Sequence, residues 1–573
     1  MEDLRILTGW LERRSSCALA AALFVLSFFL YLIPGGSAPF FTRGEAREAL
    51  VVRAMLDQNN FILPLRNGVD IPSKPPLFHW LAAFLSKLFD SRAELLLRAP
   101  TAVAAALLLS AFFVFAGRRL TRPAALSASL ILATSLDFVR AAAVTRVDMT
   151  FACWVTLGTW CLFELVEAYH KNRRTDWPLL LIASVALSLA VLSKGPAGLA
   201  LPWVVAGLYT LIRLPFRQIP WLAVICSVGL SAAIASFWYV AAYRQGGQAF
   251  LDVHLMRENV ARVVGMKDYE TGHKGNPLEL PPMLLIGLFP WSIFIVPVIA
   301  RLYRKRREMF SGEAPAELFA AIWALFYLIF FALVSSKRNV YLLPSFSAWA
   351  YLLGAELTAL ADRSAAGRRF ANALFMAFLT IVGIAAVLVA ASFVYPVLSI
   401  ATAHLKTAEL KVAEVALSGL QLALPFLVLA LALAGAARKY YVRDQFFGTA
   451  IYLAFAVILL SASAQLFVLR RVAYFESPES FMTSVNASLP RGLPLYQFDD
   501  NYYAANYYAD RDVIQIDKLP ELTDQPYGFM IAAESTLPQA RSVLGQLETL
   551  VESSTLNVYG KDRFVFVRFR GTN

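Results

Sequence analysis

Several basic side chains stand within a few residues of long apolar runs. Lys194 lies in VLSKGPAG, Arg146 in AVTRVDMTF, and Lys337 in SSKRNVYLLP. Lys74 lies between prolines in DIPSKPPLFHW. Proline fixes φ and cannot donate a backbone hydrogen bond, so this lysine is held on a stiff, non-helical segment before an apolar stretch. Charges next to a membrane are costly and usually mark a site or a partner.

The complete basic set recurs in one loop after another. It comprises Arg47, Lys74, Arg140, Arg146, Lys194, Arg257, Arg262, Lys337 and Arg338. Few carboxylates accompany it near the apolar runs, namely Glu45, Glu48 and Asp148. Any single cation could instead be a snorkelling side chain or the partner of a neighbouring acid. The recurrence of the set favours one cavity that holds a phosphate, with one or two carboxylates beside it.

Other chemistries lack their usual patterns in this sequence. There is no HExxH, no Walker A loop and no G-x-S-x-G elbow, and the five histidines are scattered. The four cysteines, Cys17, Cys153, Cys161 and Cys226, form no CxxC pair, so neither a disulfide framework nor a thiolate metal site is indicated. A lipid-linked phosphate donor fits, because its tail would lie in the bilayer and its phosphate needs cations at the surface.

The elements that must position these groups are membrane-spanning helices. The chain has 573 residues, of which 58% are hydrophobic and 16% charged. Apolar runs of about 20 residues recur, each long enough to cross a hydrocarbon core. Thirteen spans are predicted, at about 17–34, 97–117, 121–139, 149–168, 178–193, 196–213, 219–243, 280–303, 316–334, 340–361, 370–396, 420–437 and 448–469.

The connections between these spans sort by charge. One alternating set is basic: RRLTR, KNRR, RLPFR, RLYRKRR, DRSAAGRR and ARKYYVR. Under the positive-inside rule that side is cytoplasmic, and thirteen spans place the C-terminus outside. The net charge of +12 is then explained by topology and anionic lipid headgroups rather than by nucleic acid.

The outer side carries the long segments. Within 35–96, residues 45–56 and 77–89 are predicted to form amphipathic helices in the outer interface, with Glu45, Glu48 and Arg53 away from the apolar stripe of the first. Residues 1–469 would form the membrane domain, with 35–96 and 244–279 as active-site loops. Residues 470–573 read as a small outer α/β domain. Its expected strands are 493–498, 512–516, 529–532, 557–559 and 564–569, and its expected helices are 478–489 and 538–552.

The ordered motifs resemble a known family. They are RGEAREALVVRAMLDQNNFILPLRNGVDIPSKPPLFHW, LLLRAPTAVAA, TRVDMTF, LSKGPAGLALP, GLFPWS and SSKRNVYLLP. Together they resemble the ArnT-like and protein O-mannosyltransferase-like GT-C glycosyltransferases over nearly the whole chain, and the bacterial aminoarabinose transferases above all. The resemblance implies a polytopic α-helical membrane protein of GT-C type in the bacterial inner membrane, with a periplasmic C-terminal domain. It also implies an undecaprenyl-phosphate-linked sugar donor, and lipid A or another glycolipid as acceptor.

The resemblance also assigns expected roles. Donor-phosphate contacts are expected from Lys74, Arg47, Lys194, His254, Arg262, Lys337 and Tyr341. Glu45 and Asp148 would orient or deprotonate the acceptor, and displacement at the anomeric carbon would invert its configuration. Spacing alone leaves purely structural roles open for both acids. Asp148 could pair with Arg146, and Glu45 could be a helix N-terminal acid favoured by the macrodipole.

Three positions depart from the family pattern. Gly44 replaces the first acid of an Asp-Glu pair, Glu48 replaces a tyrosine, and Ser73 replaces an acid before the lysine. In the aminoarabinose transferases that acid helps to bind a metal, together with a histidine that matches His254. With Ser73 in its place no metal ligand set is predicted, and whether the protein uses a divalent metal stays open. The departures indicate a relative with another sugar or acceptor.

Two other functions are weighed against a lipid-modifying transferase. A protein O-mannosyltransferase would share the fold and the donor type, and the sequence separates it poorly. A transporter would have charges near mid-membrane, broken helices and repeated halves. The charges here gather at one surface and no repeat is visible, so the transporter is the weaker alternative.

Overall fold

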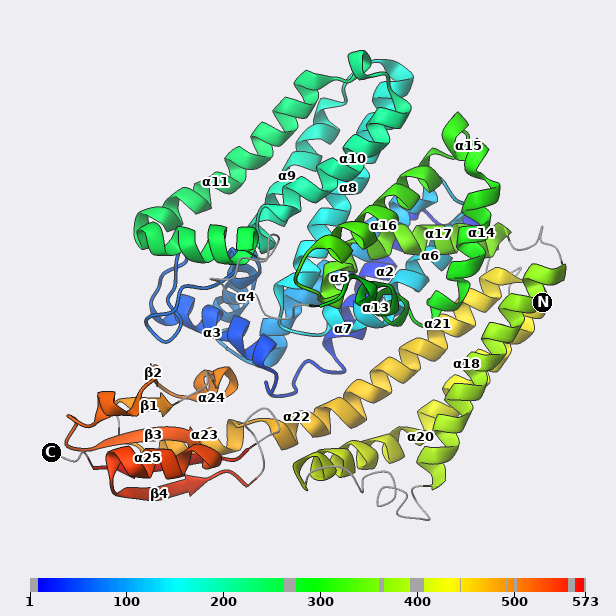
Figure 1. Cartoon of the computed structure of the whole chain (residues 1–573). Helices are drawn as coiled ribbons and strands as arrows, with labels where there is room; N and C mark the ends of the chain where they lie inside the picture. The colour runs from blue at the N-terminus through cyan, green and yellow to red at the C-terminus, as the bar shows by residue number, and fades with distance from the viewer. Residues whose placement is uncertain are drawn as a thin grey trace.

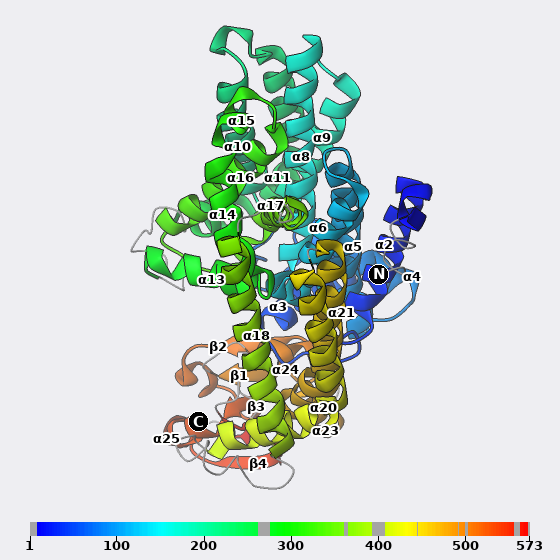
Figure 2. The same ribbon diagram turned by 90° about the vertical axis from the view of Figure 1, so that its right-hand side faces the viewer.

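The computed structural model describes residues 9–261, 275–359, 365–391, 407–443, 445–490, 492–498, 502–554 and 562–570. Figure 1 shows a large helical body with a small sheet domain beside one end of it. Long helices α18, α20 and α21 run side by side along one flank (Figure 2). The expected fold class, a helical membrane protein with a small C-terminal α/β domain, is therefore confirmed.

The helices of the body follow the apolar runs closely. Their bounds are α2 Ser16–Leu32, α3 Arg43–Asp57, α4 Leu77–Leu88, α5 Glu94–Gly117, α6 Arg122–Thr134, α7 Leu136–Ala142, α8 Val147–Asn172, α9 Trp177–Lys194, α10 Ala197–Arg213, α11 Trp221–Leu251, α13 Leu280–Gly287, α14 Ile295–Arg304, α15 Arg306–Ser311, α16 Pro315–Leu333, α17 Phe346–Ala359, α18 Ala365–Ala391, α20 Thr407–Val442, α21 Phe446–Ser463 and α22 Arg470–Glu476. A π-helical segment, η2, covers Asp252–Val260.

In the described part of the chain, seven helices are long and apolar enough to cross a membrane. The number reaches nine if each of two bent helix pairs counts as one span. The predicted total of thirteen stays a prediction.

The two bent pairs replace spans that were expected to be continuous. Helices α6 and α7 meet at 66° where Ser135 takes an extended conformation. Segments 277–287 and 291–304 meet at 108°, with Pro290 at the break. Proline has no backbone N–H to donate to a helix, which accounts for the second break.

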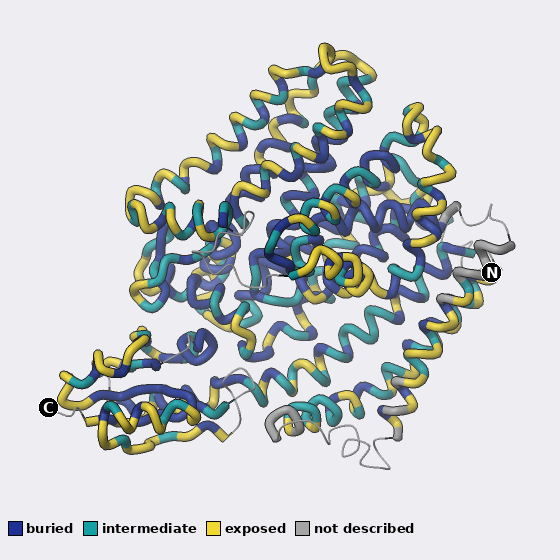
Figure 3. Tube along the Cα trace, viewed as in Figure 1, coloured by how far each residue is buried: buried dark blue, intermediate teal, exposed yellow. Residues whose placement is uncertain are grey.

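The centre of the helical body is an aromatic cluster around Trp160 of α8. Its ring centroid lies 5.8 Å from that of Trp323 on α16 and 5.6 Å from that of Tyr351 on α17. These side chains are buried, as is most of the inner body in Figure 3. Because α8 is packed on several sides, the residues of its first turn have a fixed position.

The C-terminal domain is a five-stranded sheet in the order β2-β1-β3-β5-β4. The strands are β1 Leu495–Phe498, β2 Val513–Ile516, β3 Gly528–Ala533, β4 Leu547–Glu552 and β5 Phe564–Phe569, and the helices are α23 Glu479–Ser488, α24 Tyr503–Tyr508 and α25 Leu537–Leu544. The first three strands in this order pair in parallel, and β5 pairs antiparallel with both β3 and β4.

One expected helix of this domain is correct in its first half and wrong in its second half. Residues 538–552 were predicted to be helical throughout, but α25 ends at Leu544 and Gly545 follows with φ +74°. Residues 547–552 then form the edge strand β4, because they pair with β5. The expected strand at 557–559 lies outside the described residues.

Helix α24 packs against α3 and so connects the sheet domain to the helical body. Arg53 on α3 donates from Nη1 to the carbonyl oxygens of Asn506 at 2.9 Å and Ala509 at 2.6 Å, which satisfies the end of α24. The Tyr508 hydroxyl donates to Glu94 Oε1 at 2.7 Å and accepts from the Phe40 N–H at 2.7 Å. Helix α3 is therefore held between the helical body and the sheet domain.

Candidate active site

A cavity of about 120 Å³ lies where α8, α9, α10, α16 and η2 meet. Its lining comprises Lys74, Phe151, Lys194, Ala197, Leu201, Glu258, Asn259, Phe330, Phe331, Val334, Ser336 and Tyr341. The cavity joins ammonium and carboxylate groups to an apolar, aromatic wall. That combination suits a phosphate that carries a hydrocarbon chain.

The first ion pair of the site joins two helix ends. Asp148 lies in the first turn of α8, and Lys194 is the last residue of α9. Lys194 Nζ lies 2.5 Å from Asp148 Oδ1, and Arg146 Nε lies 3.8 Å from Oδ2. The Lys194 ammonium also lies over the ring of Tyr341, 5.1 Å from its centroid. The predicted contact of Asp148 with Arg146 is thus present, but Lys194 is the closer partner.

The second ion pair joins Lys74 to Glu258 of η2. Both side chains are less than a tenth exposed. Sequence reasoning named Lys74 and missed Glu258. The signal was a lone acid in the basic segment HLMRENVAR, where an acid is a natural partner for a nearby cation.

Glu45 is buried but does not line this cavity. Its Oε1 accepts from Arg98 Nε at 3.0 Å and from the Thr145 N–H at 3.0 Å. Arg98 in turn donates from Nη1 to the carbonyl oxygens of Gly35 at 2.9 Å and Ala38 at 2.6 Å. This geometry favours a structural role for Glu45, which connects α3 to Arg98 of α5, and its catalytic role stays a prediction.

Glu48 lies one helical turn after Gly44, on the same side of α3. Its Oε1 accepts from Arg47 Nη2 at 2.6 Å, and its Oε2 lies 2.9 Å from His79 Nε2. Burial by itself would raise the pKa of Glu48, but the Arg47 guanidinium and His79 outweigh it and hold the pKa well below the usual range. Glu48 is also close enough to Asp148 for the two carboxylates to repel each other.

Glu48 and Glu45 are both buried on α3, and each contacts a cationic or histidine partner. A Cβ placed on Gly44 would lie 3.0 Å from Arg146 Cζ. The Arg146 guanidinium thus occupies the space beside the position where the family pattern has an acid.

The remaining predicted phosphate ligands differ in where they lie. Tyr341 lines the cavity, whereas Arg47 reaches toward it from α3 and attracts Glu258. Lys337 Nζ donates to the carbonyl oxygens of Ala332 at 2.8 Å and Phe331 at 3.1 Å, so it caps α16. Burial lowers the pKa of Lys337. Arg262 lies outside the described residues.

His254 is buried on η2, with its ring 4.6 Å from Phe250 and 5.4 Å from Trp238 between centroids. Its Nε2 has no hydrogen-bond partner in the described part of the chain. Within that part, no three His, Cys, Asp or Glu side chains gather as a metal site requires. The residues around His254 therefore do not form a ligand set for the metal that the family resemblance implies.

Comparisons with known proteins concern the sequence and the fold of this chain. Residues 73–239 match the family model described as dolichyl-phosphate-mannose-protein mannosyltransferase. The crystal structure of ArnT from Cupriavidus metallidurans bound to undecaprenyl phosphate superposes with a TM-score of 0.74 at 18% identity, over 97% of this chain and 98% of that one. This chain has the ArnT fold. The ArnT-like GT-C resemblance predicted from the sequence is thus confirmed.

Relatives in sequence point the same way. Undecaprenyl phosphate-alpha-4-amino-4-deoxy-L-arabinose arabinosyl transferase 2 of Proteus mirabilis is 26% identical over 348 residues, which are 60% of this chain and 60% of that protein. An uncharacterized protein of Aquifex aeolicus is 27% identical over 57% of this chain and 62% of its own length. The match to these two relatives therefore spans about three-fifths of their length.

Proposed function

We propose that this ArnT-like protein is a glycosyltransferase that moves a sugar from a polyprenyl-phosphate donor to lipid A or a related glycolipid. The observation that carries the proposal is the cavity in which Lys74 and Lys194 stand beside the aromatic wall of Phe330 and Phe331. The cations would take the donor phosphate, and the wall would take the first isoprene units. The relatives named as undecaprenyl phosphate arabinosyl transferases support this donor class.

The two ion pairs contain the charged groups that the transfer reaction would use. In the free enzyme Asp148 and Glu258 neutralise Lys194 and Lys74, which limits the cost of burying charge. A donor phosphate would replace these carboxylates as the partner of the lysines. The acceptor oxygen then forms a bond to the anomeric carbon from the opposite face, while the bond from that carbon to the phosphate oxygen breaks. The electron pair leaves with the phosphate, where the cations stabilise it.

A carboxylate released from its lysine can orient the acceptor or take its proton. Asp148 is the better placed of the two predicted catalytic acids, because Glu45 is held by Arg98 outside the cavity. Arg47, bound to Glu48 and within reach of Glu258, would add a third cation to the phosphate site. We place this site and the C-terminal domain on the periplasmic side, as the distribution of basic loops predicts.

Protein glycosylation is the second candidate, and the family model over residues 73–239 favours it. The two candidates share the donor and differ in the acceptor. A lipid-linked sugar transporter is less well supported, because the buried charges of this cavity lie at helix ends rather than in mid-helix.

A transfer assay separates these functions. Membranes that contain the protein would be given an undecaprenyl-phosphate sugar with lipid A, or with an extended serine- and threonine-containing peptide, and the products followed by mass spectrometry. We expect a glycosylated lipid, the yield of which Lys194→Met strongly lowers. Arg304→Met, an exposed control on α14, should leave the yield unchanged. Glycosylated peptide with unchanged lipid would overturn the choice of acceptor. Sugar movement across the membrane without transfer would overturn the enzyme.

A further inference from the structure

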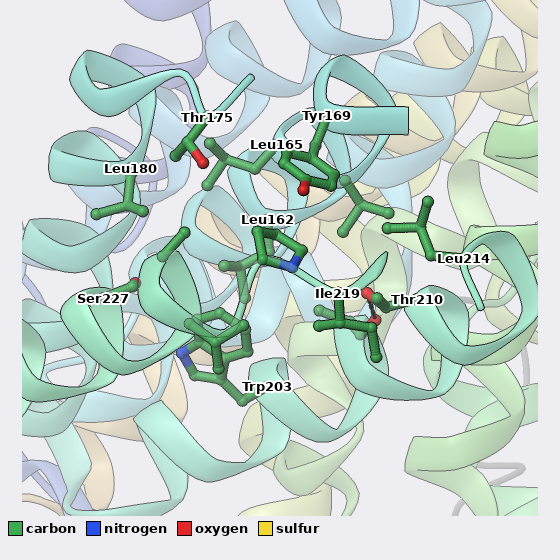
Figure 4. Close-up of a pocket in the computed structure, with 15 residues that line it drawn as sticks. Leu162, Leu165, Tyr169, Thr175, Leu180, Trp203, Thr210, Leu214, Ile219 and Ser227 are labelled. Atoms are coloured by element: carbon green, nitrogen blue, oxygen red, sulfur yellow. Dashed lines mark hydrogen bonds between the residues drawn. The ribbon is translucent and has the colours of Figure 1, made fainter. Parts of the chain in front are cut away.

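A second cavity lies at the other end of the same helices (Figure 4). Its volume is about 50 Å³, several times what one water molecule needs. Its walls come from the last part of α8, the first part of α9, the last part of α10 and the first part of α11. The α8 residues that line it begin at Leu162, which a rise of 1.5 Å per residue puts ~20 Å along the axis from Asp148.

The cavity is lined mainly by apolar side chains. They include Leu162, Leu165, Val166, Leu180, Ala206, Leu214, Ile219 and Val224. Two of its polar groups are already bonded, since the Thr210 hydroxyl donates to the Ala206 carbonyl at 2.7 Å and the Ser227 hydroxyl lies 2.9 Å from that of Ser184. Trp203 Nε1 is buried without a hydrogen-bond partner among the described residues. An apolar occupant with an acceptor atom would suit these walls.

Two loops flank this cavity, and both are basic. The exposed cations are Lys171 in the last turn of α8, Arg173 and Arg174 in the α8–α9 loop, and Arg217 in the α10–α11 loop. Arg173 Nη1 donates to Gln218 Oε1 at 2.8 Å and so ties the two loops together beside the cavity. The exposed acid in these loops is Asp176, which caps α9. Cations therefore outnumber acids around the cavity.

Aromatic side chains mark the depth of these loops in the membrane. Trp177 and Trp221 are 50% and 45% exposed at the starts of α9 and α11, and Phe216 in the α10–α11 loop is 65% exposed. Exposed tryptophans at helix ends are typical of the level of the lipid headgroups. The basic loops thus stand where the phosphates of a bilayer leaflet lie.

We propose that this end of the molecule is a binding site for an anionic phospholipid, with part of one acyl chain in the cavity and the headgroup phosphate on Lys171, Arg174 and Arg217. The occupant is a lipid rather than a free phosphate, because the cavity is apolar and only its rim is charged. It is distinct from the glycosyl donor, since the site lies at the opposite end of α8 from Asp148. The inference does not depend on the proposed function.

Lipid retention in native mass spectrometry tests this site on the full-length protein. The protein would be released from nanodiscs that contain equal amounts of phosphatidylglycerol and phosphatidylcholine. We expect selective retention of phosphatidylglycerol, reduced about tenfold or more when Lys171, Arg174 and Arg217 are all changed to Gln, since each cation near the surface contributes to anionic-lipid binding. Changing Arg304, Arg306 and Arg307 to Gln removes the same charge from another loop and should leave retention unchanged.

A substitution that fills the cavity provides a second test of the proposal. Val166→Trp would occupy the cavity and leave every rim cation in place, and we expect it to reduce retention as well, with the melting temperature as the check on folding. Equal retention of both lipids, or equal loss in the Arg304, Arg306 and Arg307 variant, would overturn the proposal. Displacement of the lipid by millimolar inorganic phosphate would also overturn it, because the rim would then be a plain anion site.

Discussion

Helix α8 carries a buried ion pair near each of its ends, and the two pairs differ in their surroundings. At its start, Asp148 pairs with Lys194 at 2.5 Å beside a cavity that holds a second lysine-carboxylate pair. Near its end, Glu167 accepts from Arg213 Nε at 3.0 Å and from the Tyr209 hydroxyl at 2.6 Å. Neither member of the second pair lines a cavity among the pockets described above.

The comparison shows that a buried ion pair alone does not identify a site. Both pairs neutralise a charge that helix packing has removed from water, and such pairs often contribute little net stability. What distinguishes the Asp148 end is empty space beside the ammonium group, with an apolar wall next to it. We therefore expect a ligand phosphate to reach Lys194, which lines the active cavity. Arg213 is bonded to Glu167 and lines neither of the two cavities described above.

The largest expected difference between the two ion pairs follows from removing the cation of each pair. We expect Lys194→Met to lower transfer by about 10²–10³-fold, because a charge-stabilising group at the reacting phosphate is lost. Arg213→Met should leave the rate per folded molecule unchanged and lower stability by about 3 kcal/mol, since Glu167 is left buried without its cation. The measurements are transfer in membranes and the melting temperature of both purified proteins. Equal rates in the two variants would show that the two ends do not differ as described.

The second largest effect concerns stability and pH at Glu48, whose pKa is held well below its usual range. A carboxylate with a lowered pKa in the folded state stabilises the protein above its unfolded pKa of about 4.3, and that stability is lost as the pH falls through the lower folded value. We expect Glu48→Gln to cost about 3 kcal/mol at pH 7. The difference in melting temperature from wild type should shrink as the pH falls below about 4. Glu521→Gln, an exposed control, should show no such convergence.

These contrasts also show what the sequence could and could not predict. Apolar runs and basic loops depend on local composition, so the helices and the small α/β domain were predictable, and so were Lys194 and Asp148 beside their spans. The pairing of Lys74 with Glu258 was not, because it joins residues 184 positions apart through the fold. Lys337 was expected at the phosphate, and that role stays a prediction. In the structure its ammonium caps α16, because the carbonyl groups that it binds lie only a few residues before it.

A third prediction concerns Glu258 in the active cavity, where a substitution is expected to strengthen ligand binding rather than weaken it. Glu258→Gln removes a carboxylate that competes with a ligand phosphate for Lys74. We expect the variant to bind undecaprenyl phosphate about tenfold more tightly, the equivalent of ~1.4 kcal/mol. Lys74→Met should weaken binding instead, and in the double variant the gain from Glu258→Gln should vanish, because the two residues act through one contact. Binding can be followed by the ligand-induced rise in melting temperature. Tighter binding that persists in the double variant would contradict the competition.

The smallest effect is expected at Lys337, which separates a capping lysine from a phosphate-binding one. Its ammonium donates to carbonyl oxygens at the end of α16, and such a cap contributes about 1 kcal/mol to stability. Lys337→Met should therefore lower the melting temperature slightly and leave the KM for the polyprenyl donor within about twofold of wild type. Lys194→Met provides the contrast, since its KM for the donor should rise. A large rise in KM for Lys337→Met, with an unchanged melting temperature, would move Lys337 from the helix cap to the phosphate site, because only a group that leaves the α16 carbonyls to meet the donor could produce it.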